Sequence, residues 1–415
     1  MNKFYLFTPG PVNVAENLRA AITSGDICHR EVDFDLLLSR VETKLLTLFA
    51  LRKPEAYRAV VVTGSGTAAN ESMLSSVVGD QQILILSNGE FGDRLYETSK
   101  IYNNRTHLLE FGWGKSIDLK KTEAYINEHD IDVVCMVHHE TSSGMLNPIE
   151  QVGALSKANG SLFIVDCVSS AGAEIIDMEK CHIGFFSSSS SKAIGSYTGL
   201  SFIVGRIDEF EKLKDLPTKT GYLNLYTFYS FLKRYSQTPN TPAVHLFFAL
   251  DQALDNILNQ GVAKRYAEIS HRANLLRRGM QALGLKFLIK EEQMCSVLTT
   301  VKLLKHISGD LLCKKLRDKA IIIYGAKGCF KGKYFQVGNI GSLSNSDIKY
   351  FLTSLGEVLL SIDSTKPAKV RHGRNTRSLT RILAPTALPI GRSIASISHD
   401  VAFETPNQPD RVGDV

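Results

Sequence analysis

A small-residue turn provides the first group of residues that could do chemistry. Gly64-Ser65-Gly66-Thr67 follows the apolar run 59–63 and precedes a stretch with helical character. Small residues let backbone N–H groups approach an anion, and the N-terminus of a helix favours negative charge. The segment matches neither GxxxxGK[ST] nor GxGxxG. It therefore indicates a phosphate site of another kind, or simply a tight turn.

Two charged residues follow later runs of the same type. Asp166 ends the apolar segment 162–166, and Lys192 follows an apolar segment and five consecutive serines. A carboxylate at the end of a buried strand is costly without a cationic partner, and a pyridinium nitrogen is one such partner. A desolvated lysine has a lowered pKa and can attack an aldehyde. Alternatively, Asp166 caps a helix or forms an ion pair, and Lys192 is a loop residue beside a serine linker.

The order of these three groups is informative. A pyridoxal 5'-phosphate (PLP) site needs this order: a phosphate-binding turn, then a carboxylate at a strand end, then a lysine after a later strand. We therefore expect PLP as the cofactor. The seven cysteines are scattered without a CxxC pair, so no metal site is expected.

Alternating elements must position these residues. Helical spacing predicts a helix over 31–51, and strand-like and helical segments then alternate to about residue 210. This alternation predicts an α/β fold with a mainly parallel sheet flanked by helices. Residues 285–355 mix shorter strands and helices, with 285–289 among the expected strands. We predict a large N-terminal domain over 1–260, a small C-terminal α+β domain over 261–363, and a poorly ordered tail over 364–415.

Composition limits the function classes. The 415 residues carry a mild net charge of +6, which argues against a nucleic-acid partner. The tail holds eight basic and four acidic residues, so it either touches a polyanion or is simply solvated. We see no signal peptide and no run of about 20 apolar residues. With an odd number of cysteines, these features predict a cytoplasmic protein without membrane contact.

Many ordered motifs also carry a family resemblance over residues 4–360. The chain resembles the fold-type I, class V PLP-dependent aminotransferases, and it most resembles the 2-aminoethylphosphonate–pyruvate branch. The motifs are FTPGPVNV, DICHRE, GSGTAANESMLSSVV, NGEFGDR, HHETSSGMLNP, FIVDCVSSAGA, SSSSSK, GLSFIV, TPNTP and VGNIG.

The resemblance implies a role for each matching residue. Lys192 is the catalytic residue that carries the cofactor, and Asp166 binds its pyridine nitrogen. The remaining cofactor contacts implied are Ser65, Gly66 and Thr67 at the phosphate, Phe91 on the ring, Thr141 at the phenolic oxygen, and Thr241 at the phosphate of the other subunit. The last contact implies a homodimer, as closed two-fold symmetry permits.

The resemblance also implies a reaction and exposes a departure from it. Nitrogen would pass from 2-aminoethylphosphonate to pyruvate, giving phosphonoacetaldehyde and alanine. The family usually has arginine where Gln336 stands, and a neutral amide cannot replace a guanidinium that clamps an anion. Arg30 or Lys327 could bind the substrate anion instead. The alternatives are a PLP lyase, a transaminase of the serine/alanine–glyoxylate type, and a weakly active PLP-binding protein.

Overall fold

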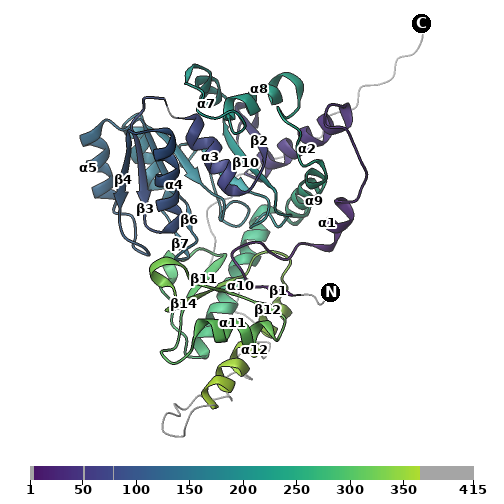
Figure 1. The fold of residues 1–415 in the computed structure, drawn as a ribbon, viewed down its shortest axis with the longest axis vertical. Helices are drawn as coiled ribbons and strands as arrows, with labels where there is room; N and C mark the ends of the chain where they lie inside the picture. Colours follow the sequence, from purple (N-terminus) through teal and green to yellow (C-terminus); the bar gives the residue numbers. More distant parts are fainter. Residues whose placement is uncertain (1–3, 50–51, 78, 365–415) are drawn as a thin grey trace, which may run out of the picture.

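The computed structural model describes residues 4–49, 52–77 and 79–364, and its larger part is built on one seven-stranded sheet (Figure 1). The strand order is β2-β10-β9-β8-β5-β3-β4. Only β10 runs against its neighbours, since it pairs antiparallel with both β2 and β9. The strands are β2 (Tyr57–Thr63), β3 (Ile83–Ser87), β4 (Thr106–Glu110), β5 (Val133–Val137), β8 (Leu162–Asp166), β9 (Ile183–Ser189) and β10 (Leu200–Arg206).

Helices cover this sheet and keep its centre dry. Every residue of β3, β5 and β9 is buried, as expected of strands that are covered on both faces. The helices of this part are α1 (Glu16–Ala21), α2 (Val32–Leu48), α3 (Gly66–Ser76), α4 (Glu90–Tyr102), α5 (Leu119–His129), α6 (Ile149–Ala158), α7 (Ile207–Lys212), α8 (Leu225–Tyr235) and α9 (Val244–Gln260). The predicted α/β architecture with a mainly parallel sheet is confirmed.

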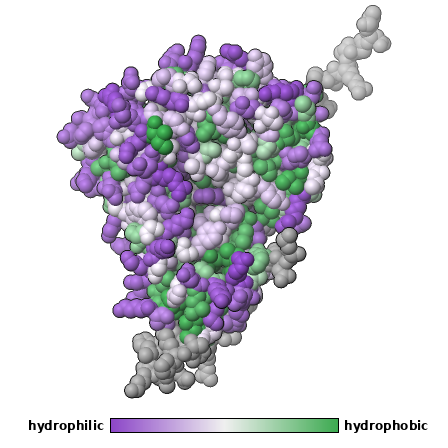
Figure 2. Space-filling model, viewed as in Figure 1, coloured by the Kyte–Doolittle hydropathy of each residue, from purple (hydrophilic) through white to green (hydrophobic). Residues whose placement is uncertain are grey.

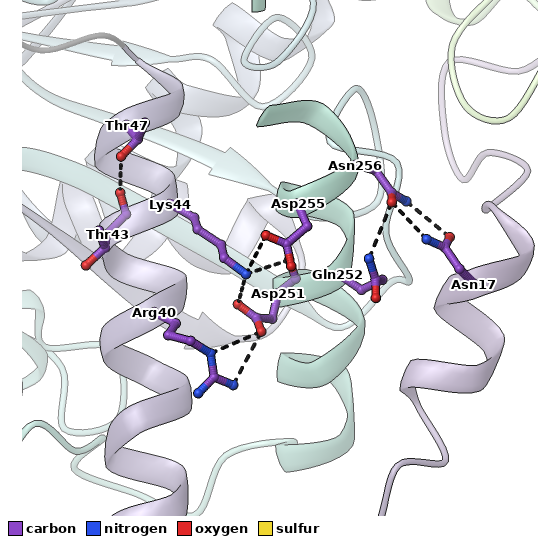
Figure 3. A network of polar contacts seen from close by, with 9 residues as sticks. All are labelled: Asn17, Arg40, Thr43, Lys44, Thr47, Asp251, Gln252, Asp255 and Asn256. Atoms are coloured by element: carbon purple, nitrogen blue, oxygen red, sulfur yellow. Dashed lines mark hydrogen bonds and ion pairs between the residues drawn. The ribbon is translucent and has the colours of Figure 1, made fainter. Parts of the chain in front are cut away.

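The pairing of α2 with α9 joins segments that are more than 200 residues apart in the sequence. Phe34 meets Phe247 edge to face, with ring centroids 5.2 Å apart. At the surface, Lys44 Nζ lies 2.7 Å from a carboxylate oxygen of both Asp251 and Asp255 (Figure 3). The apolar contact and the ion pairs together fix the N-terminal helices against the large sheet.

The chain after α9 forms a smaller α+β unit, to which the N-terminus returns. Its core helix α10 (Val262–Ala282) is followed by α11 (Gly309–Arg317) and α12 (Asn345–Ser364). The three-stranded antiparallel sheet has the order β11-β14-β13, with β11 (Leu298–Lys302), β13 (Tyr324–Gly325) and β14 (Tyr334–Gly338). The strand β1 (Tyr5–Leu6) pairs with β12 (Ile321–Ile322), and a hairpin joins β6 (His139–Glu140) to β7 (Met145–Leu146).

The two largest of the three buried hydrophobic clusters among the described residues form the cores of these two units. One contains most of the large sheet, and the second lies around α10, α11 and α12. Phe7 belongs to the second cluster and stacks on Phe351 at 4.5 Å, so the N-terminal arm contributes to the C-terminal core. The predicted strand over 285–289 is wrong, since only Phe287 makes an isolated bridge, to Val301. The predicted domain limits stay a prediction, and the tail from 365 lies outside the described residues.

Two further observations apply to the described residues. None of their helices is long and apolar enough to cross a membrane. They also contain no group of three or more His, Cys, Asp or Glu side chains that could hold a metal ion.

Candidate active site

A cavity of about 230 Å³ lies where the carboxyl ends of the central strands meet the start of α3. This is where open α/β sheets bind their ligands. Its lining brings together residues from helix starts, strand ends and loops, and the sequence places them up to 188 positions apart, from Gly10 to Thr198. Among them are seven residues predicted from the sequence: Ser65, Gly66, Thr67, Phe91, Thr141, Asp166 and Lys192.

The first turn of α3 provides the anion-binding end of this cavity. Ser65 is the N-cap residue, with an extended backbone, and its side chain makes no capping hydrogen bond. The N–H groups of Gly66 and Thr67 have no carbonyl acceptor within the described part of the chain. A Cβ on Gly66 would lie only 2.6 Å from Cγ1 of Val168, so only glycine fits there. The turn thus offers free donors and hydroxyl groups to a phosphate.

Asp166 lies at the end of β8, buried and held by two donors. Its Oδ2 accepts a hydrogen bond from Nδ2 of Asn70 at 2.7 Å, and Oδ1 accepts from the N–H of Val168 at 2.8 Å. Burial raises the pKa of this carboxyl, while the two hydrogen bonds and the charge of Lys192 oppose the rise. A cationic ring nitrogen in the cavity would stabilise the ionised form further.

Lys192 projects into the same cavity from the loop after β9. Its Nζ donates to Oγ of Ser169 at 2.8 Å and lies 5.4 Å from the ring centroid of Phe91. Ser169 Oγ is in turn 2.7 Å from Oγ1 of Thr141. Burial lowers the pKa of Lys192, and the charge of Asp166 opposes this effect. The amine is therefore more easily deprotonated than an exposed lysine, as a nucleophile toward an aldehyde requires.

Sequence reasoning missed several residues of the cavity. Asn70 lies one helical turn after Gly66, so the helical period was a usable signal for it. Ser169 stands three residues after Asp166, in a turn whose direction the sequence does not reveal. His139 also lines the cavity. Its Nδ1 lies 3.3 Å from the carbonyl oxygen of Ser169, and burial lowers its pKa to about 3, so it is a neutral hydrogen-bonding residue.

The donor set of the cavity fits PLP. The start of α3 suits a dianionic phosphate, Asp166 suits a pyridinium nitrogen, and the Lys192 amine suits the aldehyde. Phe91 offers an aromatic face beside them. Ser189 adds a buried hydroxyl that lines the cavity and has no hydrogen-bond partner within the described residues.

A second cavity of about 260 Å³ adjoins the first, and Lys192 and Phe91 line both cavities. Gln336 forms part of its wall from β14. The Nε2 of Gln336 donates to the carbonyl oxygens of Thr141 at 2.7 Å and of Ser142 at 3.2 Å. Both amide hydrogens therefore have acceptors in the protein, so Gln336 has no donor left for a substrate anion.

Two predicted residues lie together, outside both cavities. The guanidinium of Arg30 donates to the carbonyl oxygens of Thr238 at 2.7 Å and Pro239 at 3.1 Å. Oγ1 of Thr241 lies 3.4 Å from Nε2 of His29. Within the described chain, Arg30 therefore contacts the loop before α9 and does not reach the Lys192 cavity.

Comparison with known proteins identifies the family. The model of the class-V aminotransferases matches residues 21–339, which is most of the chain. The chain belongs to the class-V aminotransferase family. Such enzymes are PLP-dependent, so the membership implies PLP and confirms that the protein is an aminotransferase-type enzyme.

Individual relatives cover nearly the whole described chain. It is 29% identical to a 2-aminoethylphosphonate–pyruvate transaminase of Phocaeicola vulgatus, over 86% of this chain and 99% of the relative. It is 30% identical to the Salmonella agona transaminase of the same name, over 85% and 96%. An aminotransferase of Methanocaldococcus jannaschii is also 30% identical, over 83% and 90%.

Solved structures confirm the fold-type I architecture. Ureidoglycine–glyoxylate aminotransferase of Bacillus subtilis superposes with a TM-score of 0.83 at 23% identity, over 92% of this chain and 98% of that one. Pyridoxamine–pyruvate aminotransferase of Mesorhizobium loti also gives 0.83, at 24% identity, over 92% and 97%. At such identities the likeness concerns the fold.

Proposed function

We propose that this enzyme uses PLP to transfer the amino group of 2-aminoethylphosphonate to pyruvate, yielding phosphonoacetaldehyde and alanine. The observation that carries the chemistry is the meeting of three groups in one cavity: the Lys192 amine, the Asp166 carboxylate and the free N–H groups at the start of α3. The substrates are inferred from relatives that bear this name and match over 85–86% of the chain.

Each of these groups has a distinct task. When bound, PLP supplies an electrophilic aldehyde and a ring that draws electrons away from the substrate carbon next to nitrogen. Lys192 would hold the aldehyde and, after the substrate replaces it, its Nζ would take the proton from that carbon. Asp166 would hold the proton on the ring nitrogen. Ser169 and Thr141 position Nζ through consecutive contacts of 2.8 and 2.7 Å.

The phosphate and the ring would be held by other residues. Ser65, Gly66 and Thr67 would bind the phosphate through hydroxyl and backbone N–H donors. Phe91 would pack on the ring, and its face already lies near the cations of Lys192 and Arg94, at 5.4 and 4.9 Å from the ring centroid. These contacts orient the cofactor and exclude water from the reacting atoms.

We also propose a cytoplasmic homodimer, in which Thr241 reaches the phosphate of the other subunit. Arg30 holds the loop that carries Thr241. Val32 and Leu36 of α2 are 62% and 56% exposed, and Figure 2 shows hydrophobic residues gathered on the α9 side of the molecule. All seven cysteines are free, which agrees with a reducing compartment.

The neutral amide at position 336 favours a second candidate. Since Gln336 has no donor left for an anion, the enzyme could be a transaminase of the serine/alanine–glyoxylate type or a PLP lyase. An absorbance experiment separates these functions. Our proposal predicts that 2-aminoethylphosphonate converts bound PLP to its amine form and that pyruvate restores the original spectrum. Conversion by other amino donors alone would favour the second candidate, and PLP binding without any conversion would indicate a weakly active binding protein.

A further inference from the structure

The second cavity, beside Gln336, needs a cationic side chain if it binds an acidic substrate. An aminotransferase substrate with an acidic group needs a cation near that group, since an unpaired buried charge is costly. Position 336 does not supply one. Its amide nitrogen donates to the carbonyl oxygens of Thr141 and Ser142 and lies 3.3 Å from Oγ1 of Thr300. Two of these partners are carbonyl oxygens, which can only accept, so they determine the orientation of the amide.

The described lining of this cavity contains two cationic side chains, Lys192 and Lys327. Lys192 is assigned to the cofactor, which leaves Lys327 for a substrate. Lys327 follows β13, whose Tyr324 pairs with Gln336 across the small sheet. The ammonium group of Lys327 therefore lies on the loop after β13, and it lines the same cavity as the neutral Gln336.

Lys327 is only weakly engaged by the protein. Its Nζ lies 4.0 Å from Oε1 of Glu90, at the outer limit of an ion pair, and its side chain is 67% exposed. Glu90 already has a closer partner, because Nη2 of Arg94 lies 2.9 Å from the same oxygen. A ligand anion in the cavity could therefore compete with Glu90 for Lys327.

The charge of Lys327 also acts on the amine of Lys192. It is among the causes that lower the pKa of Lys192, after burial and the charge of Arg94. Both lysines also line the second cavity, so their ammonium groups border a common space. A substrate held on the cofactor beside Lys192 would thus present its distal group close to the charge of Lys327.

We propose that Lys327 binds the acidic group of the substrate. On binding, Lys327 would exchange its weak ion pair with Glu90 for an ion pair with the substrate. The inference deepens the proposed function and rests on it for the anionic character of the amino donor. Lysine is a point charge without the planar fork of arginine, so it accepts a phosphonate or a carboxylate without strict bidentate geometry. The substrate class is therefore small amino acids and aminophosphonates with one terminal acid group.

The test measures anion binding without turnover. Methylphosphonate is titrated into the PLP-loaded enzyme and followed by phosphorus NMR, in the wild type and in Lys327→Met, Lys327→Arg and Lys331→Met. Lys331 is an exposed lysine of the same loop and does not line the cavity, so it controls for net charge. We expect Lys327→Met to raise the Kd at least about fivefold, the effect of a partly exposed charge contact. Lys327→Arg should stay within about twofold of the wild type, and Lys331→Met should match it.

A variant of opposite sign strengthens the test. Glu90→Gln removes the competing carboxylate, so it should lower the Kd for methylphosphonate by about twofold or more. The inference is overturned if the wild type does not bind methylphosphonate, if Lys327→Met binds it as the wild type does, or if Lys331→Met weakens binding equally. Failure of the proposed function looks different: 2-aminoethylphosphonate would leave the PLP spectrum unchanged while methylphosphonate binding still depended on Lys327.

Discussion

The side-chain amide of Asn70 donates a hydrogen bond to Oδ2 of Asp166 across 2.7 Å. Asn70 belongs to α3, whose first turn forms the phosphate end of the cavity, and Asp166 ends β8. The opposite side of the Asn70 amide accepts a hydrogen bond from Ser187 on β9. Asn70 thus sets the distance between the two ends of the proposed PLP site.

Replacing Asn70 therefore tests this link. Asn70→Ala should raise the Kd for PLP about tenfold or more, because a hydrogen bond to a buried carboxylate is lost. The measurement is a titration of cofactor-free enzyme with PLP, followed by absorbance. Asn256→Ala is the matched control, since Asn256 lies in the surface network of Figure 3. Equal affinities in all three proteins would show that Asn70 has no part in cofactor binding.

The charge of Asp166 has its own expected effect. Asp166→Asn keeps the shape of the side chain but removes the charge that would hold a proton on the ring nitrogen. Turnover should fall by about 100-fold or more, as when other preorganised electrostatic groups are removed. Single-turnover conversion of bound cofactor by an amino donor measures this directly. Asp118→Asn, at the N-cap of α5 and away from the cavity, should leave the rate unchanged.

Glu140 gives the protein a predictable pH dependence. Burial raises the pKa of this carboxyl from 4.5 to about 6, despite hydrogen bonds from Ser142 and Gly92. The folded state therefore binds the proton more tightly than the unfolded state does. The resulting stability is fully present below pH 4.5 and is lost as the pH rises through about 6, a loss of about 2 kcal/mol.

The effect of Glu140 can be measured by comparing how the free energy of unfolding depends on pH in the wild type and in Glu140→Gln. Urea unfolding between pH 4 and 7 should show the wild type losing this free energy of unfolding relative to Glu140→Gln, whose amide does not titrate. Glu123→Gln, on the exposed side of α5, should follow the wild type. Parallel pH profiles of wild type and Glu140→Gln would refute the assigned shift.

Packing of the N-terminal arm on the small unit predicts a change in stability. Phe351 is fully buried and stacks on Phe7, with ring centroids 4.5 Å apart. Phe351→Ala should lower the free energy of unfolding by about 3–5 kcal/mol, through lost transfer energy and a residual cavity. Lys349→Ala, two residues away on the exposed face of α12, should change it by less than about 0.5 kcal/mol. Chemical denaturation of both variants provides the comparison.

Local patterns explain what the sequence revealed of this fold. Apolar runs ending in Asp166 and preceding Lys192 correctly indicated two strand ends, because buried parallel strands have a clear composition. Phe91 and Thr141 came from the family resemblance and not from such patterns, and they line the same cavity as Asp166 and Lys192. The strand expected over 285–289 failed because a short apolar run also suits a partly buried loop, and only Phe287 forms a bridge.

Contacts between distant segments were beyond the sequence. Gln336 was recognised as unusual, but its bonds to Thr141 and Ser142 depend on how the small sheet meets the turn between β6 and β7. Likewise, no spacing indicated that Ser169 would bridge Lys192 and Thr141. Such contacts result from tertiary packing, which has no period in the chain.

The most direct test of the account is the covalent attachment of PLP to Lys192. Purified enzyme is loaded with PLP, reduced with borohydride, digested and examined by mass spectrometry, in parallel with Lys192→Ala. The account predicts a visible absorption band in the wild type and, after reduction, PLP fixed to the peptide that contains Lys192. It predicts neither in Lys192→Ala. Attachment to a different lysine, or an unchanged band in Lys192→Ala, would contradict the account.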